Sequence, residues 1–115
     1  ILLLSGYISE QRREWGIGNP GLLAAVACHT TGAEEMSLLT RVLFLADKLE
    51  PAKDRRYPFN GQVRQKAQED LDGALVDWLS GEVRRLLDAG AAVHPQMVAA
   101  RNALLLAGRR VAEEA

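Results

Sequence analysis

The chain has one cysteine, Cys28, among its 115 residues, which excludes an intramolecular disulfide. A lone cysteine is typical of proteins in a reducing compartment, so we expect a cytoplasmic location. Long hydrophobic runs are also missing from the start of the chain, where the apolar run from Ile1 to Leu4 is far too short for a signal core or a membrane span. A membrane is therefore not an expected partner.

The chain has no excess of either charge, since its 14 basic and 15 acidic residues give a formal net charge of −1. This balance gives no general attraction to nucleic acid, and Trp15 and Trp78 show no base-stacking pattern. Nucleic acid is therefore not expected to bind, and any anionic ligand needs a local site. The sequence also has no glycine-rich phosphate loop, Cys-x-x-Cys pair or nucleophile elbow.

Strand patterns are absent, since no segment alternates apolar and polar residues for long enough. Helical spacing covers most of the sequence and predicts helices at residues 2–15, 21–28, 38–49, 60–88 and 95–111. No repeat or linker divides the chain, so we expect residues 1–115 to form a single all-α domain.

Turn and cap residues mark the limits of these helices. Ser37 is placed to cap the helix at 38–49, and Pro51 disfavours continued helix at the residue before it. Gly32 can adopt the left-handed conformation after the second helix, and Ala89-Gly90 is a stop signal for the helix from residue 60. The chain begins inside an apolar run without an initiator Met, so we expect it to be a fragment of a longer protein.

Two residues at helix ends point to chemistry. His29 follows an apolar helix, where a neutral imidazole can bind Zn, Mn or Fe, act as an acid or base, or simply bond the free helix carbonyls. Asp47 lies late in the next helix, where the helix dipole and the apolar setting oppose a negative charge. It needs a metal or a basic side chain such as Arg41, because the adjacent Lys48 is expected to point elsewhere. Two ligands do not complete a metal site, which normally takes at least three.

Polar residues follow both positions. Thr30 and Thr31 can donate hydrogen bonds to an anion, although threonines also simply end helices. The loop from Lys53 to Arg56, beside Tyr57, can clamp phosphate through bidentate arginine contacts, or it is an ordinary charged surface loop. The sequence alone leaves these alternatives open.

Together these motifs resemble the HD-domain metal-dependent phosphohydrolases. The resemblance is to the bacterial branch of symmetrical bis(5'-nucleosyl)-tetraphosphatases, which hydrolyse diadenosine tetraphosphate to two molecules of ADP, and it covers about residues 16–106. The matching motifs, in order, are His29-Thr30-Thr31-Gly32, Met36-Ser37, Leu45-Ala46-Asp47-Lys48-Leu49-Glu50-Pro51, Arg56-Tyr57-Pro58, Asp70-Leu71-Asp72, His94-Pro95 and Ala100-Arg101-Asn102.

The resemblance implies an HD-domain-like helical bundle with two divalent metal ions, often iron, with Mn, Mg or Zn as alternatives. It implies that His29 and Asp47 are metal ligands with catalytic roles. Four further residues are implied to contact the nucleotide or its phosphates: Thr30, Thr31, Arg56 and Tyr57. The His-Asp pair that names the superfamily, and the histidine before it, would lie upstream of Ile1, so the bundle is expected to lack its N-terminal helices.

Two hypotheses follow for function. The first is a phosphohydrolase of dinucleoside polyphosphates, with a nucleotide substrate as its partner and little activity in this fragment. The alternative is a degenerate HD domain, a non-catalytic helical module that binds a nucleotide or a partner. A missing N-terminal portion would uncover an apolar face, so self-association into a homodimer is a further expectation.

Overall fold

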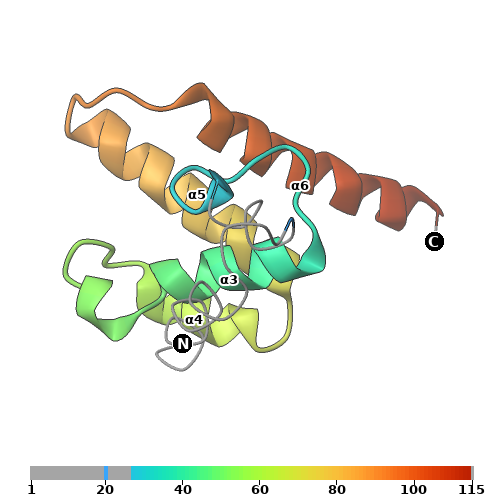
Figure 1. Cartoon of the computed structure of the whole chain (residues 1–115), viewed down its shortest axis with the longest axis horizontal. Helices are drawn as coiled ribbons and strands as arrows, with labels where there is room; N and C mark the ends of the chain where they lie inside the picture. The colour runs from blue at the N-terminus through green and yellow to red at the C-terminus, as the bar shows by residue number, and fades with distance from the viewer. Residues whose placement is uncertain (1–19, 21–26, 115) are drawn as a thin grey trace.

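The computed structural model describes Pro20 and residues 27–114, with side chains as far as Gly108. Within this part the chain is helical and has no strand, which confirms the all-α prediction (Figure 1). The predicted helix at residues 2–15, with Trp15, lies outside the described residues, as does most of the helix at residues 21–28. The described elements are α3 (Leu38–Lys48), the 3-10 turn η1 (Pro51–Lys53), α4 (Asn60–Ala67), α5 (Leu71–Asp88) and α6 (Pro95–Glu114).

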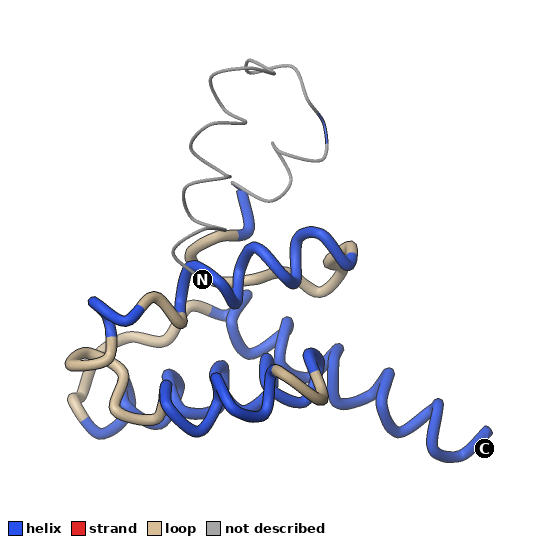
Figure 2. The backbone as a smooth tube through the Cα atoms, turned by 90° about the horizontal axis from the view of Figure 1, so that it is seen from below, coloured by secondary structure: helices blue, strands red, loops and turns tan. Residues whose placement is uncertain are grey.

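Helix α5 is central, since it contacts α3, α4 and α6. Figure 1 shows α6 above α5 and the pair α3 and α4 below it. The C-terminal half of α6 extends beyond the other helices (Figure 2). Among the described residues, no helix combines the length and the apolar character that crossing a membrane requires.

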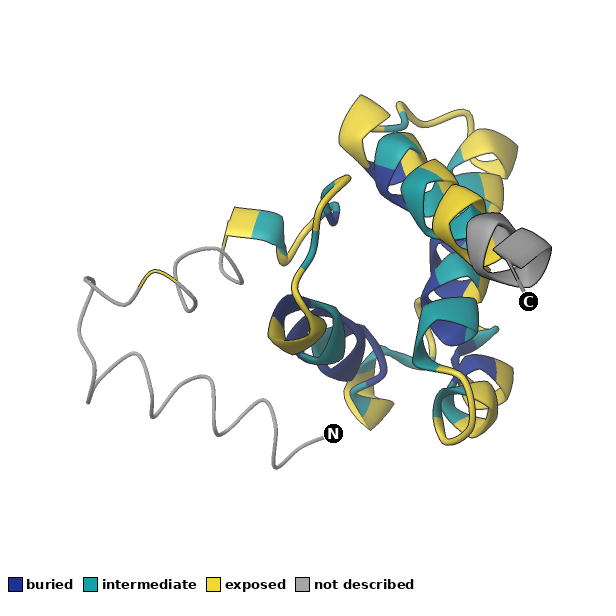
Figure 3. Cartoon of the chain, turned by 90° about the vertical axis from the view of Figure 1, so that its right-hand side faces the viewer, coloured by how far each residue is buried: buried dark blue, intermediate teal, exposed yellow. Residues whose placement is uncertain are grey.

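The core is built around Trp78 on α5, which is only 1% exposed. Edge-to-face contacts join its ring to Phe44 of α3 at 5.6 Å, to Tyr57 at 5.2 Å and to Phe59 at 6.2 Å between ring centroids. Such edge-to-face pairs are favourable beyond the apolar area that they bury. Figure 3 shows the buried residues on the faces that the helices turn toward one another. The core therefore fixes the end of α3 and the following loop against α5.

Helix α3 begins and ends as its sequence predicts. The Ser37 hydroxyl accepts a hydrogen bond from the backbone N–H of Thr40 at 3.1 Å, which caps the first turn. Glu50, the residue before Pro51, is extended with φ −57° and ψ 129°. The proline therefore stops the helix directly after Asp47, Lys48 and the capping residue Leu49.

The predicted continuous helix from residue 60 to residue 88 is wrong, because the chain breaks between Ala67 and Leu71. Asp70 is extended there, with φ −146° and ψ 93°, and its carboxylate accepts the backbone N–H of Gly73 at 2.9 Å. This is an N-cap, so a new helix begins at Leu71. The longest described helix is instead α6, with 20 residues against 18 in α5. Gly90 ends α5 in the left-handed conformation, with φ +66°, as expected.

Candidate functional site

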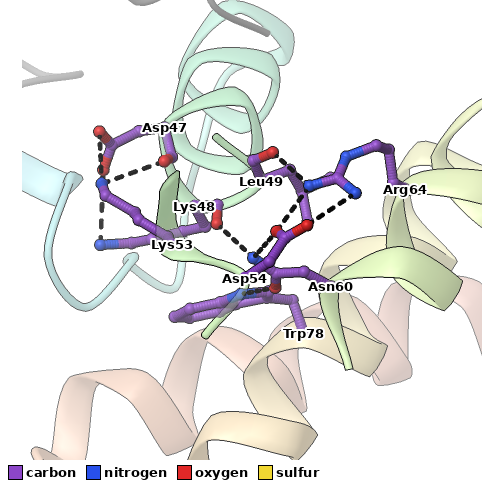
Figure 4. A network of polar contacts seen from close by, with 8 residues as sticks. All are labelled: Asp47, Lys48, Leu49, Lys53, Asp54, Asn60, Arg64 and Trp78. Atoms are coloured by element: carbon purple, nitrogen blue, oxygen red, sulfur yellow. Dashed lines mark hydrogen bonds and ion pairs between the residues drawn. The ribbon is translucent and has the colours of Figure 1, made fainter. Parts of the chain in front are cut away.

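Asp47 sits in the last turn of α3, where its carboxylate faces two lysines (Figure 4). Lys53 Nζ lies 3.0 Å from Oδ1, and Lys48 Nζ lies 3.6 Å from Oδ2. The Lys53 ammonium also donates to the backbone carbonyl oxygen of Asp47 at 3.1 Å. The cation that the position of Asp47 requires is therefore supplied by these basic side chains. The expectation that Lys48 points elsewhere is wrong.

Lys48 is unusual because it is buried, with only 8% of its surface exposed. Its ammonium lies 5.2 Å from the ring centroid of Phe44 and 5.6 Å from that of Trp78, which provides cation–π attraction. Burial lowers the pKa of Lys48 below its usual 10.5, because desolvation outweighs the attraction of Asp47. The long aliphatic stem lets the side chain turn back onto the core although its neighbour faces outward.

Side chains of α4 form hydrogen bonds with the backbone carbonyl groups at the end of α3. The amide of Asn60, which is fully buried, donates to the carbonyl oxygen of Lys48 at 2.8 Å. Arg64 donates to the carbonyl oxygen of Leu49 at 2.7 Å and to Asp54 at 2.8 Å. Helix-end carbonyls have no intrahelical partner, so these bonds fix the turn that carries Asp47.

The arginine contact also changes the chemistry of Asp54. The hydrogen bond from Arg64 lowers the pKa of the Asp54 carboxyl below its usual 3.8, and Asn60 acts in the same direction. Sequence reasoning did not single out Asn60 or Arg64. The sequence marks Asn60 only as the start of a helix, and nothing in its spacing signals that its amide bonds to Lys48, twelve positions earlier, and to Trp78, eighteen positions later.

His29 follows the two helical residues Ala27 and Cys28 and is exposed. Its Nε2 lies 3.4 Å from the Thr30 hydroxyl oxygen. The Thr31 hydroxyl donates to the backbone carbonyl oxygen of Gly32 at 3.1 Å. The Thr30 hydroxyl thus lies beside the imidazole, whereas the Thr31 proton is already engaged within the same short turn.

Gly32 shapes this turn. It is left-handed, with φ +76°, and its N–H donates to the carbonyl oxygen of Cys28 at 2.8 Å, which confirms the predicted conformation. A Cβ at this position would lie 3.1 Å from the Cβ of Ala100 on α6. The turn after His29 therefore packs closely against α6.

Arg56 and Tyr57 lie differently with respect to solvent. Tyr57 is a core residue, 6% exposed, with its ring against Trp78. Arg56 is exposed, and its guanidinium carbon lies 5.4 Å from the centroid of the Tyr57 ring. Substrate contact by either residue stays a prediction. Of the two, only Arg56 carries a charge, and its guanidinium is exposed to solvent.

The donors for a metal can be judged from the same contacts. The Lys53 ammonium between the carboxylate and the carbonyl of Asp47 shows that these oxygens accommodate a cation. The described residues nevertheless contain no group of three or more His, Cys, Asp or Glu side chains that could hold a metal ion. They provide donors of the right chemistry, His29 and Asp47, but do not complete a metal site by themselves. The ligand roles of both residues stay predictions.

Comparison with known proteins gives the family context. No protein-family model matches the chain. Symmetrical bis(5'-nucleosyl)-tetraphosphatases from Halalkalibacterium halodurans and Bacillus subtilis are 40% and 32% identical to it, over 83% and 82% of this chain. The chain spans about half the length of these relatives, 50% of each.

Solved structures agree with the sequence comparison. The crystal structure of a predicted HD superfamily hydrolase involved in NAD metabolism, from Clostridium acetobutylicum, matches with a TM-score of 0.72 and 31% identity. The match covers 89% of this chain and 52% of that one. Both the resemblance and the HD-domain-like fold expected from the sequence are thus confirmed. The chain is therefore similar in sequence and in fold to about half of an HD-superfamily hydrolase.

Proposed function

We propose that this chain is part of a metal-dependent phosphohydrolase that cleaves dinucleoside polyphosphates, with diadenosine tetraphosphate giving two molecules of ADP. The observation that carries the proposal is the 40% identity to a symmetrical tetraphosphatase over 95 residues. A stretch of that length in a chain of 115 residues necessarily includes His29 and Asp47. The lone Cys28 supports a cytoplasmic setting.

The residues of this chain have distinct parts in the proposed reaction. The exposed guanidinium of Arg56 and the ammonium of Lys53 neutralise charge on the phosphate oxygens, which is the main requirement of phosphoryl transfer. Thr30, beside His29, donates a hydrogen bond to the same anion. Divalent ions, when bound, would supply a hydroxide at neutral pH and further neutralise the phosphates. Asp47 and His29 are the residues of this chain that would hold them.

We also propose that the 115-residue segment alone turns over little substrate. The support is the donor set of the described residues, in which fewer than three metal-binding side chains come together. A pair of ions needs about five or six protein donors, so a complete site requires residues beyond the described ones.

The test is hydrolysis of diadenosine tetraphosphate by the complete natural protein, with Mn²⁺ or Fe²⁺ added and products separated by chromatography. ADP as the sole nucleotide product is the expected result. Arg56→Gln should raise KM about tenfold with a smaller change in kcat, since it removes a phosphate contact. Arg84→Gln, an exposed arginine of α5, is the matched control and should leave both unchanged.

Two outcomes would contradict the proposal. Release of AMP and ATP would mean that the phosphate chain is cut asymmetrically. Tight binding of diadenosine tetraphosphate without any hydrolysis, with either metal, would favour the non-catalytic nucleotide-binding module. That alternative has its own support in the two lysines that already neutralise Asp47.

A further inference from the structure

The contact between Lys53 and Asp47 has the geometry of a bound cation. One ammonium lies 3.0 Å from the carboxylate oxygen Oδ1 and 3.1 Å from the backbone oxygen of the same residue (Figure 4). The C-terminal end of α3 adds the negative end of the helix dipole. Three sources of negative potential thus meet at the Lys53 nitrogen.

Backbone hydrogen bonds hold the main chain of Lys53 in place beside Asp47. The 3-10 turn begins at Pro51, and the N–H of Lys53 donates to the carbonyl oxygen of Glu50 at 2.9 Å. The carbonyl oxygen of Lys53 accepts the N–H groups of Arg56 and Tyr57, each at 3.0 Å. The position of the residue is therefore fixed by its main chain, and only its side chain is left to move.

The two lysines beside Asp47 differ in how freely their side chains can move. Lys48 is enclosed by Phe44 and Trp78, and its contact with the carboxylate is longer, at 3.6 Å. The Lys53 side chain is 33% exposed, so it can swing into solvent without opening the core. Lys53 is thus the displaceable partner of the pair.

We propose that Lys53 is a built-in competitor for the Asp47 carboxylate, so that a divalent cation binds Asp47 only by displacing the Lys53 ammonium. This rests on the proposed function, in which Asp47 is a metal ligand. Since the ammonium uses both Oδ1 and the backbone oxygen, an ion on the carboxylate and the ammonium in its present position would repel each other at short range. Lys53 therefore sets the metal affinity without being a metal ligand.

The experiment measures Mn²⁺ binding to the complete natural protein by titration calorimetry, with electron paramagnetic resonance of free Mn²⁺ as a second readout. Lys53→Met keeps the length of the side chain and removes its charge. It should tighten Mn²⁺ binding about fivefold, the effect of removing one partly exposed ion pair. Lys53→Arg retains a competing cation and should bind Mn²⁺ with close to wild-type affinity.

Lys66→Met is the matched control, because Lys66 forms an ion pair of the same length, 3.0 Å, with Asp77. It should leave Mn²⁺ affinity unchanged, whereas Asp47→Asn should weaken it strongly. Unchanged or weaker binding in Lys53→Met, together with weaker binding in Asp47→Asn, would overturn the competition while leaving the proposed function intact. Unchanged binding in Asp47→Asn would overturn the ligand role of Asp47 and the competition together.

Discussion

Asn60 accepts a hydrogen bond from the indole N–H of Trp78 at 3.1 Å, and both residues are buried, at 0% and 1% exposure. The same amide donates to the carbonyl oxygen of Lys48 at 2.8 Å. One side chain therefore joins the end of α3 to the central helix α5, directly beyond Asp47. The position of the candidate site depends on this amide.

Asn60→Ala should lower the free energy of unfolding by about 2–4 kcal/mol, because it leaves two buried polar groups without a partner. Urea unfolding followed by tryptophan fluorescence and by circular dichroism measures the change. Gln62→Ala, an exposed position on the same helix, is the control and should stay within about 0.5 kcal/mol of wild type. A near-neutral Asn60→Ala would contradict the role of this amide.

The buried Lys48 predicts a pH-dependent stability. Its pKa is lowered in the folded protein, so between that value and 10.5 the unfolded chain binds more protons at this residue. The contribution of Lys48 to stability therefore rises with pH through this window, and below it the charged form opposes folding. Lys48→Met should raise the free energy of unfolding near neutral pH.

The excess stability of Lys48→Met over wild type should shrink as the pH approaches 10.5, the ordinary lysine value. Urea unfolding at a series of pH values measures both proteins side by side. Lys66→Met, at an exposed lysine, should show no such convergence. A wild-type protein that is more stable than Lys48→Met across the whole range would contradict the prediction.

The break between α4 and α5 predicts a specific role for Asp70. Asp70→Ala removes the cap on the N–H of Gly73 and should cost about 1 kcal/mol of stability. Asp70→Asn retains a capping oxygen and should cost much less. Thermal unfolding compares these variants with Glu69→Ala, an exposed neighbour in the same turn that should have little effect. Equal melting temperatures for Asp70→Ala and Glu69→Ala would argue against the cap.

His29→Ala and Asp47→Ala should each lower hydrolysis of diadenosine tetraphosphate by the complete natural protein more than about a hundredfold, since a lost ligand weakens a metal centre more than a lost supporting contact. Circular dichroism should show unchanged helicity. His94→Ala is the control, because His94 is exposed and its Nδ1 only accepts the N–H of Gln96 at the start of α6. Normal turnover by either of the first two variants would remove that residue from the site.

The limits of α3 were predictable because local residues determine them. Ser37 and Pro51 act within a few positions of the helix that they begin and end, so the sequence carries the whole signal. The break at Asp70 was missed for the opposite reason. Apolar residues recur at Val63, Ala67, Leu71 and Leu75 without interruption, and the cap became visible only through the contact with Gly73.

The candidate site was predictable in its residue types but not in its contacts. That Asp47 needs a cation follows from its place near a helix end, but the sequence does not say which cation. Lys53 reaches it through the fold of η1, and Lys48 through an aliphatic stem that turns onto Phe44. Tyr57 is buried because its ring packs edge-to-face with that of Trp78, a contact between segments that helical periodicity cannot reveal.

The left-handed turn at Gly32 has a consequence for how the two predicted ligands are held. His29 precedes a turn that rests on Ala100, whereas Asp47 belongs to a helix end that is bonded to Asn60. The position of the imidazole therefore depends on α6, and the position of the carboxylate depends on α4. Any tilt of α6 alters the separation of the two groups even when every residue near them is intact, so mutations along α6 can tune this site from a distance.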